Sequence, residues 1–337
     1  MKLFSRARMG VLAALVVCLT SGWTGAQPIA SKDTSVNGWL MHVHDASRYR
    51  AYTGTFVVSA GGSMASAKIW HACEGDQQIE RVESLSGTPR STFRRNDRVI
   101  TFFPESRIAV AETRDSLGIF PGILKANESA INDYYQLKRL GLERIAGFEA
   151  ELVQLTPNDN LRYGYRVWSE KRTGLVMQLQ TLDLDGRVLE QAAFSELRLD
   201  ATVSVGKLHQ MMGNTEGYRV ERLELQKVNP EARGWVVQKV VSGFRPMGCY
   251  GRTGTPAAGI SARNEGVIQW IFSDGLATVS LFVEAFDGKR HGREGYTDMG
   301  GSTHTLTRRI DDWWATVVGE VPVSTLMTFA MSLERKK

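Results

Sequence analysis

Residues 162–199 constrain the fold most, because they read as three strands joined by two tight turns. Tyr163 and Tyr165 alternate with polar residues, and a period of two is typical of a β-strand with one buried face. Thr173-Gly174 closes the first turn, and Asp185-Gly186 is the strongest short hairpin signal in the chain. We therefore expect an antiparallel sheet whose apolar face packs against another element. The opposite, polar face carries Arg162, Arg166, Gln178 and Gln180.

Short strands separated by turn residues continue through the first half of the chain. Gly61-Gly62 and Asn96-Asp97 mark two of the turns. This spacing is typical of an all-β sandwich or barrel, and closing or half-closing such a sheet protects its edges. The predicted strands cover residues 52–59, 65–71, 78–85, 91–95, 98–103, 107–111, 134–145, 149–157, 162–168 and 175–181, with a last strand ending at 199.

Two segments depart from the strand pattern. Residues 35–49 predict a helix, since apolar residues recur at helical spacing after Ser35, which can cap the first turn. His42 and His44 point to different sides of that helix and make no metal pair. Residues 115–130 are apolar with glycine and proline joints, so we expect them to cross the open side of the sheet as a plug or lid.

The chain of 337 residues is long enough for two domains. We predict a first domain at 27–210 and a smaller second domain at 216–337. Segments 251–266 and 287–302 are rich in glycine and polar residues and are predicted to be mobile loops. The strands predicted after residue 217 are 218–228, 234–242, 267–272, 278–285, 303–309 and 313–318, followed by a helix with Pro322 at its first position.

The first 26 residues read as a cleavable secretory signal. Lys2, Arg6 and Arg8 precede an apolar run of about ten residues, which is too short to span a bilayer, and Ala26 ends a small-residue cleavage site. Val17 before Cys18 disfavours lipid attachment. Cleavage removes three of 41 basic side chains and none of 36 acidic ones, so the formal charge falls from +5 to +2. A near-neutral chain outside the cytoplasm gives little reason to expect nucleic-acid binding.

Two cysteines, Cys73 and Cys249, remain after this cleavage. In an oxidising compartment they favour one disulfide that joins the two halves of the chain, and the alternative is two separate buried thiols.

The sequence contains no pattern that predicts an enzyme. A Gly-x-Ser-x-Gly elbow, a phosphate-binding Gly-x-x-x-x-Gly-Lys loop and a His-Glu-x-x-His pair are all missing. Asp183-Leu-Asp185-Gly186 resembles part of a calcium loop, but Glu190 comes too early to complete it, so a plain hairpin turn is favoured. We expect no cofactor, no metal and no catalytic residue.

Large apolar side chains are the main candidates for binding surfaces. An ordinary packed core explains most of them, and the alternative is a half-barrel whose concave face holds acyl chains. The cavity candidates are Phe56, Val58, Trp70, Phe120, Trp168 and Met177, and the candidates for a partner face or a small-domain core are Phe272, Phe282, Trp313 and Trp314.

Residues 162–191 resemble the RseB/MucB family, periplasmic negative regulators of the envelope-stress sigma factor of the sigma-E or AlgU type. No single motif is catalytic; the order and spacing of several segments carry the resemblance along nearly all of the chain. The further segments are Trp39-Leu40, Asp45-Ala46-Ser47, Tyr134-Tyr135, Leu142-Glu-Arg-Ile-Ala-Gly147, Phe272-Ser-Asp-Gly-Leu276 and Val318-Gly-Glu-Val-Pro322.

The resemblance implies an α+β, β-rich fold. Its N-terminal domain would be a half-open antiparallel β-barrel with crossing helices, similar to the lipoprotein carriers LolA and LolB, followed by a smaller C-terminal α/β domain that binds the anti-sigma factor. It also implies that the protein binds the periplasmic domain of a single-span, RseA/MucA-like anti-sigma factor and shields it from a DegS-like protease. Lipopolysaccharide, lipid or mislocalised lipoprotein would release it.

Two other functions compete with this one. A lipoprotein carrier of the LolA/LolB type would share the first domain but would not need residues 218–337. A secreted hydrolase would need a reactive side chain, and the sequence nominates none. Whether the chain forms a homo-oligomer is left open by the sequence.

Overall fold

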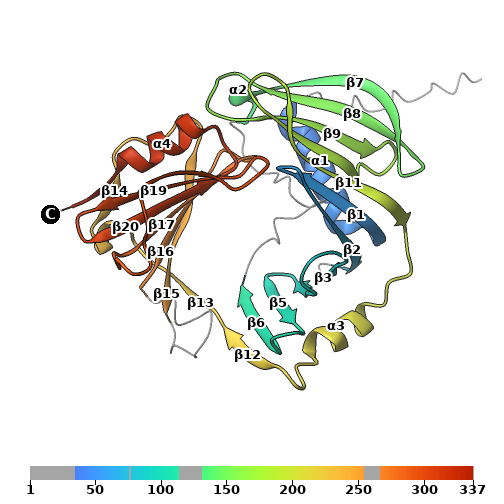
Figure 1. Cartoon of the computed structure of the whole chain (residues 1–337). Coiled ribbons are helices and arrows are strands. Elements are labelled where there is room, and N and C mark those ends of the chain that lie inside the picture. The colour runs from blue at the N-terminus through green and yellow to red at the C-terminus, as the bar shows by residue number, and fades with distance from the viewer. Residues whose placement is uncertain (1–34, 76, 114–130, 254–265, 337) are drawn as a thin grey trace, which may run out of the picture. The chain divides into compact units, whose positions relative to one another are not determined.

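Strands are the main secondary structure of the described residues, and a computed structural model arranges most of them in one sheet of twelve strands and one of seven (Figure 1). The structure describes residues 35–75, 77–113, 131–253 and 266–336. The predicted signal segment and the predicted lid at 115–130, with Phe120, lie outside the described residues. The β-rich, α+β fold class expected from the sequence is confirmed.

Twelve strands form the first sheet among the described residues, called the large sheet below, in the order β12-β6-β5-β4-β3-β2-β1-β11-β10-β9-β8-β7. Every neighbouring pair is antiparallel except β12 and β6. The order is open, as expected for a half-open sheet. The strands are β1 (Tyr52–Ala60), β2 (Ser63–Glu74), β3 (Gln77–Ser84), β4 (Ser91–Arg95), β5 (Arg98–Phe103), β6 (Ile108–Thr113), β7 (Tyr135–Ile145), β8 (Phe148–Pro157), β9 (Gly164–Glu170), β10 (Val176–Leu182), β11 (Val188–Leu199) and β12 (Arg219–Arg222).

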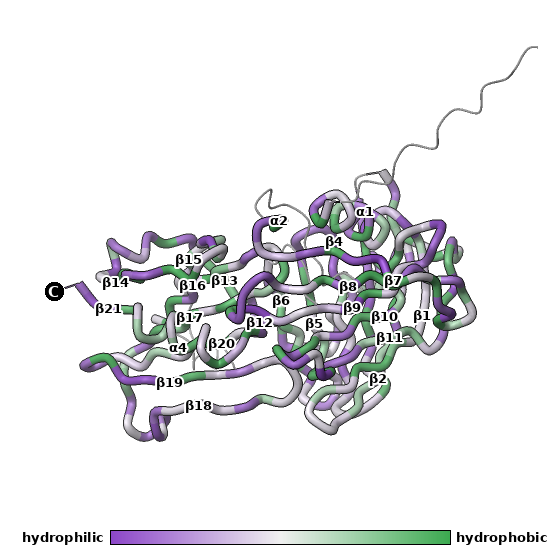
Figure 2. Tube along the Cα trace, turned by 90° about the horizontal axis from the view of Figure 1, so that it is seen from above, coloured by the Kyte–Doolittle hydropathy of each residue, from purple (hydrophilic) through white to green (hydrophobic). Residues whose placement is uncertain are grey.

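The predicted hairpins at 162–199 are confirmed as β9, β10 and β11. Their last strand also joins the first part of the chain, because β11 pairs with β1 from Leu199 opposite Tyr52 to Glu190 opposite Ala60. Gly186 has a φ of 80°, which the tight β10–β11 turn requires and which glycine adopts without steric strain. Along the strands of the large sheet hydrophobic and hydrophilic residues alternate (Figure 2).

One face of the large sheet packs against helix α1 (Val36–Tyr49). The Ser35 hydroxyl caps this helix by accepting from the Gly38 N–H at 3.0 Å, as the sequence predicted. The short helix α2 (Ile131–Tyr134) lies beside α1. The apolar stripe of α1 is buried with the rings and aliphatic side chains of β1 and β8–β11, and burial of such side chains contributes about 1.5–3 kcal/mol each.

The other face of strands β2–β6 packs against helix α3 (Val205–Gly213). Leu208 of α3 is buried there with Ile79, Phe93 and Phe102. The Ser204 hydroxyl caps α3 by accepting from the Lys207 N–H at 3.2 Å. This helix is nine residues long.

Seven strands form the second sheet among the described residues, called the small sheet below, in the order β13-β15-β16-β17-β20-β19-β18. Helix α4 (Val323–Ser332) packs on its strands and buries Leu326 and Phe329 (Figure 1). The strands are β13 (Glu224–Lys227), β15 (Arg245–Thr253), β16 (Ile268–Ser273), β17 (Thr278–Ala285), β18 (Gly295–Asp298), β19 (His304–Ile310) and β20 (Trp313–Gly319), and a separate pair joins β14 (Trp235–Val237) to β21 (Leu333–Arg335), with a single 3-10 turn at Glu231–Arg233.

Four strand predictions in this region were wrong. The predicted strand at 234–242 is reduced to the three residues of β14. The predicted strand at 218–228 is divided, since β12 joins the large sheet and β13 the small one, and between them the Leu223 N–H donates to the Ala111 carbonyl. Strand β15 was missed because Pro246 and Gly248 weaken the strand pattern. Strand β18 lies inside the segment predicted to be a loop, and all four of its residues are exposed.

None of the helices in the described residues is long and apolar enough to cross a membrane. The domain boundary expected between residues 210 and 216 stays a prediction.

Candidate functional site

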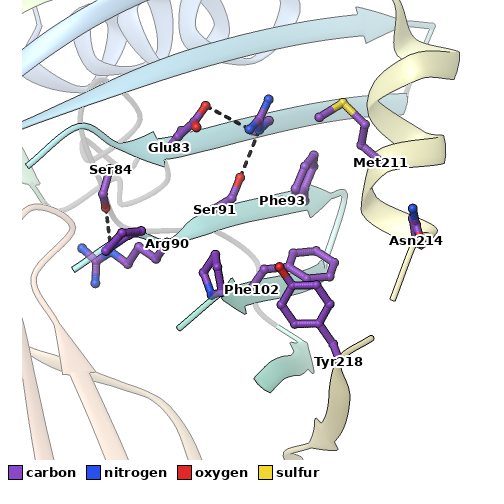
Figure 3. A pocket seen from close by; sticks show the side chains of 12 residues that line it. Glu83, Ser84, Arg90, Ser91, Phe93, Phe102, Met211, Asn214 and Tyr218 are labelled. Atoms are coloured by element: carbon purple, nitrogen blue, oxygen red, sulfur yellow. Dashed lines mark hydrogen bonds and ion pairs between the residues drawn. The ribbon is translucent and has the colours of Figure 1, made fainter. Parts of the chain in front are cut away.

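A pocket of about 340 Å³ lies on the face of the large sheet that carries α3 (Figure 3). Strands β3, β4 and β5 supply one wall, and Met211, Asn214 and Tyr218 supply the other. Pro89 and Pro104 are exposed at its rim. The pocket therefore joins two distant parts of the chain, strands β3–β5 and the residues that follow β11.

The floor of the pocket is aromatic. The rings of Phe93 and Phe102 meet edge to face with centroids 5.8 Å apart, and Phe102 meets Tyr218 in the same way at 5.0 Å. Such pairs contribute about 0.5–1.5 kcal/mol beyond the burial of their area. Phe93 and Phe102 are buried, and Tyr218 is half-buried, so the floor is anchored in the core and presents apolar surface to the pocket.

Arg81 is held in place on the wall of the pocket. Its Nε donates to the Ser91 hydroxyl at 3.0 Å, and its Nη2 lies 2.9 Å from a Glu83 carboxylate oxygen. Its guanidinium carbon stands 4.8 Å from the centre of the Trp70 ring and 5.5 Å from that of Phe93. Stacking on rings suits the planar, weakly hydrated guanidinium, and the pairing with Glu83 neutralises its charge locally.

Arg90 differs from Arg81 because it is exposed. Its Nε donates to the Ser84 hydroxyl at 3.1 Å (Figure 3). Among the described residues no carboxylate forms an ion pair with Arg90. With Arg81, Glu83 and Arg90 as its charged lining residues, the pocket has a formal charge of +1. The site can therefore accept an apolar group on its floor and one negative charge at its rim.

A second cluster of charged groups is closed to solvent. The Arg162 side chain is 0% exposed, and its Nη1 donates to Asp274 in the β16–β17 turn at 3.0 Å. Its Nε donates to Asp159 at 3.0 Å and its Nη2 to the Ser242 carbonyl at 2.6 Å. The Tyr134 ring stacks on the guanidinium at 4.5 Å. This group, with Tyr135, is called the Arg162 junction below.

Asp274 is as well satisfied as its partner. It accepts from the Tyr135 hydroxyl at 3.2 Å and from the N–H groups of Leu276 and Ala277 at 2.9 and 2.7 Å. Burial raises the pKa of the Asp274 carboxyl above its usual value, while these N–H donors and Arg162 oppose the rise. The Arg162 junction is thus a structural contact between the β8–β9 loop and the small sheet.

His304 on β19 makes a further polar contact between the two sheets. Its Nε2 lies 2.8 Å from the Tyr163 hydroxyl and its Nδ1 lies 2.9 Å from the Tyr296 hydroxyl. Burial lowers the pKa of His304, and raises that of Tyr163 to about 12. A neutral ring here can donate from one nitrogen and accept at the other.

The predicted cavity residues do not share one surface. Phe56, Trp168 and Met177 are buried in the core beneath α1, and Val58 packs against it. Trp70 packs against the cluster on the other face, because it pairs with Thr53 while Phe56 pairs with Ala67 in the β1–β2 ladder. The core interpretation therefore describes three of these residues, and the lipid cavity stays a prediction.

The candidates for the partner face divide in a similar way. Phe272 is 0% exposed and belongs to the small-domain core that the sequence offered as the alternative. Trp314 is 6% exposed, but its ring packs on Phe286 and His291, outside that core cluster. Phe282 and Trp313 are half-buried. Of the four candidates only these two are partly exposed, although Trp313 also packs against the small-sheet core, and the partner face stays a prediction.

The structure corrects the prediction of a Cys73–Cys249 disulfide, because both cysteines are free thiols. Cys73 lies near the end of β2 opposite Gln78, and Cys249 lies on β15 opposite Trp270 in the other sheet. Burial raises the pKa of the Cys249 thiol to about 11, which makes it unreactive.

Sequence reasoning missed Arg81, Arg90 and Tyr218 as lining residues. The two-residue turn at 96–97 sets the β4–β5 register. Extending the pairing from β4 to β3 would have placed Arg81 opposite Phe93. No sequence signal placed Tyr218 over Phe102. Within the described residues, no group of three or more His, Cys, Asp or Glu side chains is arranged to hold a metal ion.

Comparison with protein families gives matches along almost the whole described chain. A model of the MucB/RseB N-terminal domain matches residues 35–212, and a model of the MucB/RseB C-terminal domain matches residues 229–334. The sigma factor AlgU regulatory protein MucB of Pseudomonas aeruginosa is 27% identical over 314 residues, covering 90% of this chain and 92% of MucB. The sigma-E factor regulatory protein RseB of Haemophilus influenzae is 24% identical over 276 residues, covering 81% and 83%.

A crystal structure of MucB in complex with MucA(peri) has a similar fold. It matches with a TM-score of 0.66 and 25% identity over 89% of this chain and 98% of that one. A crystal structure of MucB alone gives a TM-score of 0.63 at 24% identity over 88% and 97%.

Proposed function

This chain belongs to the MucB/RseB family, and we propose that it is a periplasmic negative regulator of a sigma-E-type envelope-stress response. The observation that carries the proposal is the match of both family domains, in order, to a chain whose relatives are named regulatory proteins of sigma factors AlgU and sigma-E. The predicted signal segment at residues 1–26 supports the compartment.

The proposed partner is the periplasmic domain of a single-span, MucA/RseA-like anti-sigma factor. The similarity to a MucB structure that holds MucA(peri) supports this choice. By covering that domain the protein would keep a DegS-like protease from cutting it, so the sigma factor would stay bound at the membrane. Lipid, lipopolysaccharide or mislocalised lipoprotein would displace the protein and start the cut.

We assign sensing to residues 27–210 and anti-sigma binding to residues 216–337. Phe282 and Trp313 are the surface candidates for that contact. An aromatic hot-spot residue at the centre of an interface contributes about 2 kcal/mol or more, which corresponds to roughly a 30-fold change in Kd.

The test is co-purification of the full chain with the anti-sigma periplasmic domain, with and without lipopolysaccharide. We expect retention of the domain, loss of retention when lipopolysaccharide is added, and protection of the domain from the protease in the complex. Failure to retain the domain would remove the proposal, whereas retention that lipopolysaccharide leaves unchanged would remove only the release step.

In cells, deletion of the gene should raise basal transcription from envelope-stress promoters. Phe282→Ala and Trp313→Ala should do the same in part. Tyr49→Ala, an exposed aromatic residue on α1, is the matched control and should leave transcription unchanged.

A further inference from the structure

The pocket at β3–β5 is small for a lipid receptor. Its volume of about 340 Å³ lies near the bottom of the range of roughly 300–1,000 Å³ that ligand pockets occupy. It has room for one or two side chains or a single short chain, and none for a lipid with several acyl chains. Its occupant is therefore a small group or a short part of something larger.

The lining of the pocket has the composition of a protein interface. Aromatic residues, methionine and arginine are enriched at the centre of such interfaces, and the pocket combines Phe102, Tyr218, Met211 and two arginines. The aromatic floor is anchored in the core, so little side-chain entropy would be lost on binding. These features favour a side chain of a protein partner as the occupant.

The charges of the pocket define what that partner must carry. Arg81 is stacked on Trp70 and paired with Glu83, so it offers shape and little net charge. Arg90 is exposed, bonded to the Ser84 hydroxyl and without an ion-pair partner among the described residues. One carboxylate at Arg90 would neutralise the pocket.

We propose that this pocket binds an extended segment of a protein partner through an aromatic or aliphatic side chain next to an acidic one. The apolar side chain occupies the floor formed by Phe93, Phe102 and Tyr218, and the carboxylate pairs with Arg90 (Figure 3). This assignment rests on the proposed function, because it places a segment of the anti-sigma periplasmic domain in the pocket. It adds the large sheet, most of which lies in the region assigned to sensing, to the surface at residues 216–337 that holds the partner.

The test measures the Kd of a fluorescently labelled anti-sigma periplasmic domain for the full chain. Arg90→Glu should weaken binding at least tenfold, and Tyr218→Ala should weaken it to a similar degree if its circular dichroism and unfolding midpoint show a folded protein. Arg98→Glu is the matched control, since Arg98 is exposed on neighbouring β5 and does not line the pocket. It should bind within twofold of wild type.

A charge exchange makes the test specific. Replacing the acidic residues of the labelled domain one at a time with arginine should identify one change that weakens wild-type binding and restores at least tenfold of the affinity for Arg90→Glu. Such rescue requires a direct pairing, which a general loss of stability cannot imitate.

Each contrary outcome has a separate meaning. Wild-type protein that does not bind the domain overturns the proposed function together with this inference. Wild-type binding that Arg90→Glu leaves unchanged overturns only the pocket assignment. Loss of binding to vesicles containing lipopolysaccharide in Arg90→Glu, with unchanged binding of the domain, overturns the assignment in favour of a lipid.

Discussion

Arg162 and Arg90 are both held by hydrogen bonds and differ in almost everything else. Arg162 is closed to solvent and donates to Asp159, Asp274 and a backbone carbonyl. Arg90 lies at the rim of a pocket and donates to a serine hydroxyl. A buried cation must have its donors satisfied or the fold is destabilised, whereas a hydrated cation can exchange water for a ligand. The Arg162 junction is therefore a structural contact, and the pocket is a place for binding.

Breaking the Arg162 junction should have the largest effect. Asp274→Ala leaves the guanidinium buried without its main counter-charge, and removing one partner of a buried pair destabilises a protein by about 3–5 kcal/mol. Urea unfolding followed by circular dichroism should show the loss. An unchanged midpoint would mean that the junction is hydrated in solution and that the contrast with the pocket is wrong.

The double variant Arg162→Met, Asp274→Leu separates the two causes of that loss. It removes both charges and keeps apolar volume, so it should recover part of the stability lost in Asp274→Ala. No recovery would place the effect in the other contacts of Asp274, such as the Tyr135 hydroxyl.

Two tyrosines allow a matched comparison of the junction and the pocket. Tyr135→Phe removes a buried hydroxyl that donates to the Asp274 carboxylate, and hydrogen bonds to charged groups contribute about 1.5–3 kcal/mol. Tyr218→Phe keeps the ring that packs on Phe102 and should change the free energy of unfolding by less than about 0.5 kcal/mol. Equal losses of unfolding free energy in the two variants would contradict the distinction between a structural junction and a binding pocket.

The antiparallel strands were predictable because their signals are local. Alternation and two-residue turns located β4, β5 and β17 to the residue, and the capped stripe at 35–49 located α1. Prediction failed where pairing with strands distant in the sequence decides the structure. Strand β15 carries Pro246 and Gly248 and exists because β13 and β16 pair with it. The exchange of sheets at Leu223 has no local signal either.

The site was less predictable than the fold, for the same reason. Alternation placed Arg162 on the polar face of a strand, but Arg162 precedes β9 and is covered by Phe244 and the β16–β17 turn. Large apolar residues marked the core correctly, as Met177 shows. Arg81 and Arg90 line a pocket whose other wall is distant in the sequence, and a single sequence does not predict which distant residues come together.

The His304 contact predicts a pH dependence that the pocket should not share. Because burial lowers the pKa of His304, the unfolded chain takes up the proton first as the pH falls below about 6.5. The stability is thus present above that pH and declines below it, by at most about 1.4 kcal/mol per pH unit for one proton. Unfolding of His304→Gln between pH 7 and 5 should show a shallower decline than wild type.

The matched control for this pH prediction is Thr305→Ser, at the next position of β19 and without a titrating group. It should follow the wild-type curve. Parallel curves for wild type and His304→Gln would show that the imidazole has the same proton affinity in both states.

The smallest effect on stability is expected from Arg90→Gln. The side chain is exposed and its bond to Ser84 competes with water, so the free energy of unfolding should stay within about 0.5 kcal/mol of wild type. A loss above about 1 kcal/mol in urea unfolding would make Arg90 a structural residue and would weaken the case for the pocket. An unchanged midpoint together with weaker partner binding would show that Arg90 contributes to binding the partner and not to the stability of the fold.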